Sequence, residues 1–251
     1  MKVLITGASS GIGRDFARIL SSSYDELILV ARDKNNLEKV KKEISANTNI
    51  MVITESTDLS DYNNCVKLFN KYKNIDLLIN NAGFGDCGYF EKTDLMKDVN
   101  MINTNITALH TLTKLYLNEM IKNNRGHILN VASIAAFVPG PLMATYYASK
   151  SYVLKLSESI KEELNHKKTN VKISVLCPGP VKTNFEKNAN VEFQVSKADS
   201  YNVAKYAIKH LNRFYITPGL SVKFTRVLSK FVPNSLIAKF IFKIQKRRIK
   251  R

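Results

Sequence analysis

The feature that most constrains the fold is an alternation of short apolar runs with longer amphipathic stretches, which begins at the first residues. Continuous apolar runs are typical of strands buried on both faces of a parallel sheet, and the longer stretches have helical periodicity. The predicted strands are Val3–Thr6, Leu27–Val30, Met51–Thr54, Leu77–Asn80, His127–Ala132, Val171–Leu176 and Tyr215–Thr217. The predicted helices lie near 11–22, 35–46, 61–72, 92–123, 145–166 and 198–211. This order predicts an α/β fold, with a doubly wound parallel sheet of about seven strands and helices on both faces.

The chain length and composition fit one globular domain. The sequence has 251 residues, of which 45% are hydrophobic and 24% are charged. It contains no run approaching the ~20 apolar residues of a membrane-spanning helix. The first residues enter a predicted strand directly, without the apolar segment of a secretory signal, so we expect a cytoplasmic protein.

The metal-binding residue types are scattered. The cysteines are Cys65, Cys87 and Cys177, and the histidines are His110, His127, His166 and His210. Neither set has the spacing of a disulfide framework or of a metal site. We therefore assign no metal.

The net charge of +17 is concentrated in one part of the chain. Residues 1–199 contain 25 basic and 21 acidic side chains, whereas residues 200–251 contain 13 basic side chains and no acidic one. The excess therefore belongs to a C-terminal segment, and nucleic acid is not an expected partner of the chain as a whole.

A glycine-rich turn follows the first predicted strand and opens the first predicted helix. Glycines in such a turn let the backbone approach a pyrophosphate, which then lies at the positive end of the helix. The string Thr6-Gly7-Ala8-Ser9-Ser10-Gly11-Ile12-Gly13 resembles the TGxxxGIG motif of short-chain dehydrogenases/reductases. The resemblance covers about residues 1–220 and implies a single Rossmann-type catalytic domain there. It implies cofactor contacts from Gly7, Ser9, Ser10, Gly11, Ile12 and Gly13.

The end of the second predicted strand bears on the choice of cofactor. An arginine there accommodates the 2′-phosphate of NADP, whereas an acidic side chain accepts hydrogen bonds from the ribose of NAD. Arg32 takes the first loop position and Asp33 follows it. By the resemblance NADP(H) is favoured over NAD(H), although Asp33 could compete and Arg32 could be only a solvated loop charge.

Three further motifs match the family at the ends of later strands. Asp58 and Leu59 resemble its adenine contact, but Asp58 or Ser60 could instead cap the next helix. The string Asn80-Asn81-Ala82-Gly83 matches NNAG, which in relatives steadies the sheet and lies near the cofactor ribose. The string after the sixth strand resembles PGxVxT, which implies cofactor contacts from Pro178, Gly179, Val181 and Thr183.

The candidate catalytic pair lies at the start of the helix near 145–166. Tyr146 and Lys150 are spaced i, i+4 and so share one helical face, where an ammonium favours the phenolate of a neighbouring tyrosine. A phenol with a lowered pKa is a useful proton donor to a carbonyl oxygen. Tyr147 has no lysine four residues later.

The resemblance completes a catalytic tetrad. Ser133 precedes Tyr146 by 13 residues, and Asn105 precedes Ser133 by 28. The family roles are a hydrogen bond to the substrate oxygen for Ser133, acid/base catalysis for Tyr146, and contact with the nicotinamide ribose for Lys150. Asn105 would kink its helix and hold a water of the proton relay, with Asn103 as the nearby alternative. Tyr146 and Lys150 thus belong to both the catalytic and the cofactor-binding sets.

Two segments after the last motif concern substrate and partners. Residues 184–197 mix charges with Phe185, Val191, Phe193 and Val195, which suits a lid over a partly apolar substrate. Residues 221–251 form a basic amphipathic extension. It could contact anionic membrane lipids peripherally, or it could pack on the domain or at a subunit interface.

The leading hypothesis is an NAD(P)-dependent oxidoreductase that reduces an apolar ketone or aldehyde, steroid-like or acyl-type, with NADPH. The expected partners are a small carbonyl or alcohol substrate and a second copy of the chain, in a dimer or tetramer built on the helices near 92–123 and 145–166. The alternative is a catalytically silent nucleotide-binding sensor or membrane-associated adaptor.

Overall fold

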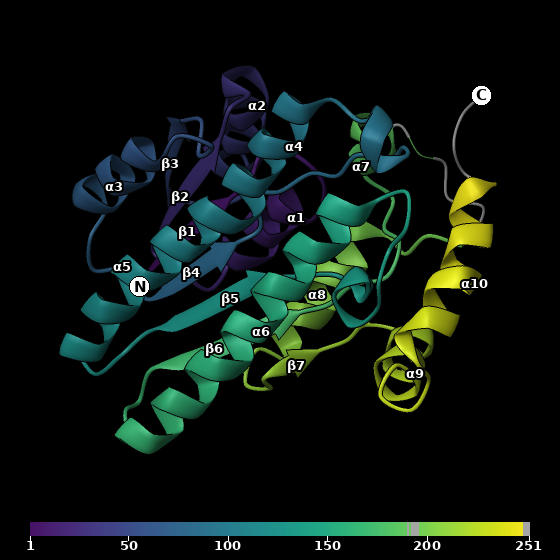
Figure 1. Ribbon diagram of the computed structural model, residues 1–251. Helices are drawn as coiled ribbons and strands as arrows, with labels where there is room; N and C mark the ends of the chain where they lie inside the picture. Colours follow the sequence, from purple (N-terminus) through teal and green to yellow (C-terminus); the bar gives the residue numbers. More distant parts are fainter. Residues whose placement is uncertain (190, 192–195, 248–251) are drawn as a thin grey trace.

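The predicted doubly wound parallel sheet is confirmed. The computed structural model describes residues 1–189, 191 and 196–247, and this part of the chain forms a seven-stranded sheet in the order β3-β2-β1-β4-β5-β6-β7 (Figure 1). All neighbouring strands are parallel. The strands are β1 (Lys2–Thr6), β2 (Glu26–Ala31), β3 (Met51–Ser56), β4 (Leu77–Asn80), β5 (His127–Val131), β6 (Lys172–Leu176) and β7 (Tyr215–Ile216).

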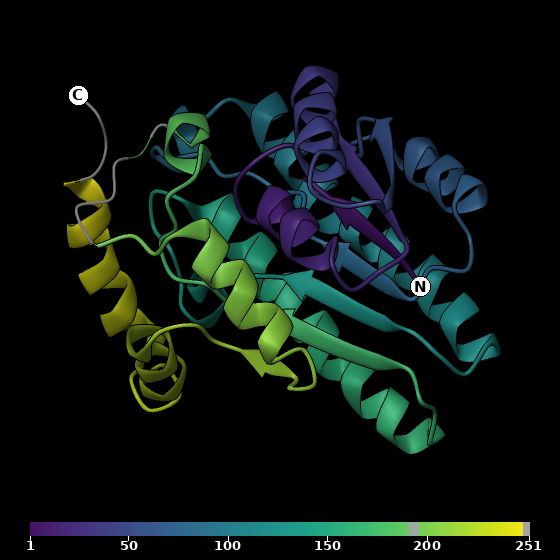
Figure 2. The ribbon, with the colours of Figure 1, turned by 180° about the vertical axis from the view of Figure 1, so that it is seen from behind.

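Helices cover both faces of the sheet, as Figures 1 and 2 show from opposite sides. One face carries α1 (Gly11–Leu20), α2 (Lys34–Ser45) and α8 (Ser200–Lys209), and the other carries α3 (Tyr62–Lys71), α5 (Leu109–Lys122) and α6 (Ala144–Lys167). Successive residues of a strand point to opposite faces, so that Val3 and Ile5 enter one core and Leu4 enters the other. This two-sided burial explains why the strands are apolar throughout.

The predicted helix near 92–123 has a different internal structure. A short 3₁₀ helix, η1 (Phe90–Lys92), precedes α4 (Leu95–Ile102). The π-helix η2 (Asn103–Ala108) then joins α4 to α5. Such π segments are rare and occur frequently at functional sites. Two short helices, η3 (Ile134–Phe137) and α7 (Phe185–Asn188), follow β5 and β6.

A buried polar network ties the middle of the sheet to its covering helices. The Asn80 amide donates to Thr113 Oγ1 at 3.0 Å and to Asn130 Oδ1 at 2.9 Å. The Asn130 amide in turn donates to Ser157 Oγ at 3.0 Å. Buried amides need such partners, because an unpaired buried polar group costs about 1–3 kcal/mol. The network therefore fixes β4 and β5, whose ends carry site residues.

The C-terminal helices α9 (Leu220–Leu228) and α10 (Asn234–Lys246) lie at one side of the molecule, beyond the edge strand β7 (Figure 1). Helix α9 contributes Val222, which is 1% exposed, to a core cluster. In helix α10 the buried residue is Gln245, whose exposed fraction is also 1%. None of the helices in the described ranges is both long and apolar enough to cross a membrane.

A half-buried histidine at the start of β5 predicts acid sensitivity. His127 Nε2 lies 2.8 Å from Ser174 Oγ, and burial together with the Lys172 cation lowers the pKa of His127 to about 4. The unfolded chain, with a histidine pKa near 6.5, therefore binds more protons than the folded protein as the pH falls below about 6.5. We expect the free energy of unfolding to fall by up to about 3 kcal/mol between pH 6.5 and 4 through this group.

Urea unfolding at pH 7 and at pH 4.5 measures this effect. His127→Gln removes the titrating ring and should flatten the difference, whereas His166→Gln, at an exposed position, should leave it unchanged. An equal acid sensitivity in the His127 variant would contradict the assignment.

Candidate active site

A cleft of about 620 Å³ opens beyond the carboxyl ends of the strands. It lies where β1 has β2 on one side and β4 on the other, which is the point in an open α/β sheet where ligands bind. The predicted cofactor residues other than Gly13, together with Ser133, Tyr146 and Lys150, line it. They are Gly7, Ser9, Ser10, Gly11, Ile12, Arg32, Asp58, Leu59, Asn81, Ala82, Gly83, Tyr146, Lys150, Pro178, Gly179, Val181 and Thr183. The structure thus brings residues from the whole length of the sheet into one site.

The start of α1 forms the part of the cleft suited to phosphate. Gly7 and Gly11 have φ of +66° and +53°, a region that favours glycine. Ser10 precedes the helix, and its side chain makes no capping hydrogen bond to any described residue. The amide N–H groups of the first turn are therefore available to an anion. Gly13 lies behind this turn, packed against the Gly7 carbonyl.

Arg32 and Asp33, the two candidates for selecting the cofactor, lie at the far end of the cleft and have different surroundings. Asp33 caps α2, since its Oδ1 accepts from the Asn36 backbone N–H at 2.9 Å and its Oδ2 accepts from the Asn36 amide at 2.6 Å. Both carboxylate oxygens are thus engaged. Arg32 lines the same end of the cleft, and its cation is one of the groups that act on the pKa of the nearby Asp58. Burial raises the pKa of Asp58, but hydrogen bonds from Ser60 and the nearby Arg32 charge outweigh it, and the net pKa is lowered.

The alternative interpretation of Asp58 and Ser60 as helix caps is wrong. The N-cap of α3 is Asp61, whose carboxylate accepts from the Asn63 N–H at 2.8 Å. Asp58 instead accepts from the Ser60 N–H at 3.0 Å and lies at the edge of the cleft. Asp58 therefore does not cap α3, although the sequence allowed that role.

The NNAG segment clamps the glycine turn to β4. The Asn81 amide donates to the carbonyls of Thr6 at 3.0 Å and Gly7 at 3.2 Å. The Thr6 hydroxyl accepts from the backbone N–H groups of Asn81 and Ala82, both at 3.0 Å. These four bonds hold the backbone of two neighbouring strands in register at the floor of the cleft.

Tyr146, Ser133 and Lys150 converge at the other end. Ser133 follows β5, and Tyr146 lies in the first turn of α6. Lys150 is 5% exposed, donates to the Val131 carbonyl at 3.0 Å, and has its Nζ 5.9 Å from the centre of the Tyr146 ring. Ser133, from the end of β5, and the Tyr146–Lys150 pair of α6 therefore share one wall.

The acidities of this group differ from the sequence expectation. Burial raises the pKa of Tyr146 to about 12, and a hydrogen bond with Ser133 opposes the rise. Burial lowers the pKa of Lys150 to about 8, so that this ammonium is still mostly charged at pH 7. In the structure the Ser133 hydroxyl favours the phenolate, and the effect of burial on the Tyr146 pKa outweighs it.

Asn105 lies in the π segment and is fully buried. Its amide donates to the Phe84 carbonyl at 2.9 Å and to Ser149 Oγ at 3.0 Å, and its Oδ1 accepts from the Phe84 N–H at 3.0 Å. A Cβ added at Gly83 would lie 2.9 Å from Asn105 Oδ1 and 3.4 Å from Lys150 Nζ. Gly83 therefore lets the asparagine and the lysine approach each other.

An apolar wall beside Tyr146 combines Phe185 and Val191, which the sequence predicted for a lid, with residues such as Met143 that the sequence analysis did not select. The Phe185 ring centre lies 5.1 Å from that of Tyr146, and a core cluster joins these rings to neighbouring side chains. The members of the cluster are Cys87, Met143, Tyr146, Tyr147, Phe185, Ala189 and Val191. Phe193 and Val195, predicted for the same lid, lie outside the described residues.

Gln245 of α10 supports this wall from behind. Its amide donates to the Tyr147 hydroxyl at 2.9 Å and lies 3.6 Å from the Met143 sulfur. Its Oε1 is buried without a hydrogen-bond partner among the described residues. The sequence offered one signal, an amide between Ile244 and Lys246 in a stretch that from Leu236 onward is otherwise apolar and basic.

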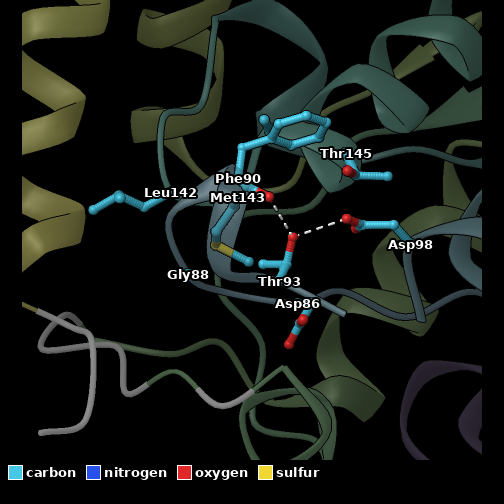
Figure 3. A pocket seen from close by; sticks show the side chains of 9 residues that line it. Asp86, Gly88, Phe90, Thr93, Asp98, Leu142, Met143 and Thr145 are labelled. Carbon is cyan, nitrogen blue, oxygen red and sulfur yellow. Dashed lines mark hydrogen bonds between the residues drawn. The ribbon is translucent and has the colours of Figure 1, made fainter. Parts of the chain in front are cut away.

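A second cavity of about 10 Å³ lies beside Met143, under the loop that follows β4 (Figure 3). Thr93 lines it, and the one proton of its hydroxyl is shared between the Phe90 carbonyl oxygen at 3.0 Å and Asp98 Oδ2 at 2.9 Å. This volume holds at most a water molecule, so the cavity is not a substrate site.

Comparison with known proteins agrees with this geometry. The sequence pattern of the short chain dehydrogenase family matches residues 1–193, and the chain belongs to that family of oxidoreductases. An NADP-dependent 3-hydroxy acid dehydrogenase of Schizosaccharomyces pombe is 34% identical over 81% of this chain and 79% of its own length.

Two solved structures have the same fold. A short-chain dehydrogenase from Sphingobium yanoikuyae in complex with NADPH has a TM-score of 0.83 and 24% identity, over 93% of this chain and 97% of that one. A short chain dehydrogenase/reductase from Burkholderia phymatum in complex with NAD has a TM-score of 0.82 and 26% identity, over 90% of this chain and 92% of that one. The chain is thus an oxidoreductase enzyme that uses a nicotinamide cofactor.

Proposed function

We propose that this enzyme reduces an apolar ketone or aldehyde with NADPH. The observation that carries the proposal is the convergence of Ser133, Tyr146 and Lys150 at one end of a cleft whose other end carries Arg32. The apolar wall of Met143 and Phe185 beside the phenol supports a substrate with an apolar body.

The cleft fits a dinucleotide in shape and chemistry. Its volume lies within the range of cofactor sites, and the first turn of α1 presents amide N–H groups to the phosphates. Gly7, Gly11 and Gly83 are positions where a side chain would fill the floor of the cleft or collide with Asn81, Thr183 or Asn105. When bound, the nicotinamide supplies the hydride.

The residues of the chain supply the proton and the orientation. Tyr146 would donate its proton to the carbonyl oxygen as hydride arrives, and Ser133 would hold that oxygen by a hydrogen bond. Lys150 would hold the ribose hydroxyls and, by its charge, favour the phenolate that the reaction leaves behind. Asn105, bonded to the Phe84 backbone, would position the backbone around a proton-relay water.

The preference for NADPH rests on Arg32 and on the engagement of Asp33. A guanidinium pairs with a phosphate bidentately, whereas the Asp33 carboxylate already accepts one hydrogen bond from Asn36 on each oxygen. The relative from S. pombe is NADP-dependent by name, which supports the same choice.

Fluorescence titration with NADPH and NADH tests this preference. We expect NADPH to bind at least about ten-fold more tightly, and Arg32→Ala to remove about ten-fold of that ratio, which corresponds to about 1.4 kcal/mol. Lys34→Ala, at the exposed start of α2, is the matched loss of one charge and should leave the ratio unchanged. Equal affinities for both cofactors in the native enzyme would contradict the proposal.

A screen of ketones and aldehydes followed at 340 nm tests the reaction itself. Oxidation of NADPH with an apolar carbonyl is the expected result. Tight cofactor binding with no turnover across the panel would favour a nucleotide-binding sensor instead.

We also propose a domain of residues 1–220 followed by an extension, and a homo-oligomer. The exposed apolar side chains of α4, among them Leu95 at 73% and Met96 at 63%, support a subunit contact along the α4–α5 segment.

A further inference from the structure

Helix α9 presents its apolar side outward. Its exposed apolar residues recur at helical spacing and continue into the turn beyond the helix: Leu220, Phe224, Val227, Leu228 and Phe231. Leu220 is 82% exposed, Phe224 66% and Phe231 79%. At about 3.6 residues per turn they fall on one side of the helix, opposite the buried Val222. A helix that merely covers the domain would bury this stripe instead.

Helix α10, which follows α9 in the chain, also exposes apolar side chains. Gln245 is its buried anchor, while Leu236 and Phe240 are 56% and 65% exposed. Lys239, Lys243 and Lys246 are exposed as well. We call the outward residues of the two helices and the turn between them the C-terminal face: Leu220, Lys223, Phe224, Val227, Leu228, Lys230, Phe231, Leu236, Lys239, Phe240, Lys243 and Lys246.

The charge of this face selects its partner. Every charged residue from 200 onward is basic, and Lys223 and Lys230 flank the apolar stripe of α9. A second copy would oppose basic surface with basic surface, because a two-fold contact pairs the same patch with itself. A nucleic acid would neutralise the lysines but leave the aliphatic and aromatic side chains without an apolar partner. A bilayer of anionic lipids offers both an apolar layer and negative headgroups.

We propose that the C-terminal face docks peripherally on an anionic lipid bilayer. Leu220, Phe224 and Phe231 enter the boundary between headgroups and acyl chains, and the flanking lysines contact the headgroups. Gln245, on the buried side of α10, bonds to Tyr147 of the cleft wall, so that the helix carrying part of the docked surface packs against the apolar end of the cleft.

Flotation of the full chain with vesicles tests the docking. The chain should float with vesicles of equimolar phosphatidylcholine and phosphatidylglycerol, and far less with phosphatidylcholine alone or in high salt. Phe224→Ser/Phe231→Ser should lower the partition coefficient on anionic vesicles by about ten-fold or more. Lys223→Gln/Lys230→Gln should lower it by roughly 30-fold, and only on the anionic vesicles.

Met51→Ser/Tyr62→Ser provides the matched control, since these apolar side chains are 60% and 56% exposed on β3 and α3. It should float like the native chain, and all variants should retain NADPH affinity, which monitors folding independently of lipid. The proposal is overturned if the native chain stays off anionic vesicles, or if the phenylalanine variant floats equally well. It is overturned too if light scattering finds a dimer that the same variant dissociates.

Discussion

Replacement of Tyr146 by phenylalanine is expected to lower the turnover number of carbonyl reduction by about 10²–10⁴-fold, the usual contribution of a positioned general acid. The variant removes only the hydroxyl, and the ring keeps its contacts with Phe185 and Tyr147. NADPH affinity and thermal stability should therefore change little. Initial rates at 340 nm under saturating NADPH, with fluorescence titration of the cofactor, measure the two effects separately.

Tyr152→Phe is the matched control on the same helix. Its hydroxyl lies 2.7 Å from His110 Nδ1 at the surface, away from the cleft. That variant should turn over like the native enzyme. Normal turnover in Tyr146→Phe would instead remove the tyrosine from the mechanism and leave the cleft as a binding site.

Replacement of Gly13 by alanine should disable the cofactor turn. An added Cβ would lie 2.2 Å from the Gly7 carbonyl oxygen and 2.5 Å from the Asn81 amide nitrogen, both of which belong to the clamped floor of the cleft. Alanine favours a helix over glycine by about 1 kcal/mol, but overpacking against fixed backbone costs about 3 kcal/mol and so decides the sign. We expect a net loss of about 2 kcal/mol in unfolding free energy and a loss of NADPH affinity of at least 100-fold.

Gly179→Ala separates a steric cause from a general intolerance of this site to side chains. Among the described residues a Cβ there would meet only Val222, at an ordinary distance of 3.4 Å. Its unfolding free energy should stay within about 1 kcal/mol of the native value. If Gly13→Ala has the same midpoint of urea unfolding as the native protein and binds NADPH normally, the floor of the cleft is more adaptable than its hydrogen bonds imply.

The fold and most of the cleft could be predicted because they depend on local patterns. Apolar strands such as β1 and β2 report two-sided burial directly, and the glycine turn and the NNAG string have fixed positions at strand ends. Parallel strands bring their carboxyl ends to one edge, so that Ser133 and the start of α6 had to lie near the turn after β1.

The features that escaped prediction depend on long-range contacts. Gln245 lies 98 residues from Tyr147, and no local pattern pairs them. The high pKa of Tyr146 arises from burial, which spacing along a helix does not report. The assignment of the cap of α3 failed because Asp58, Ser60 and Asp61 are all good capping types within one short stretch, and the register of the chain decides among them.

The clasp between Asp33 and Asn36 has a consequence for how such an enzyme evolves. The carboxylate that would welcome a plain ribose is present in the chain but is held by the first turn of the next helix. Freeing its Oδ2 requires no new acidic residue, only the loss of the Asn36 side-chain amide, while Oδ1 stays on the backbone N–H at that position. The choice between the two coenzymes therefore depends on how α2 begins. A single substitution at Asn36, remote from the reacting carbon, could change that choice.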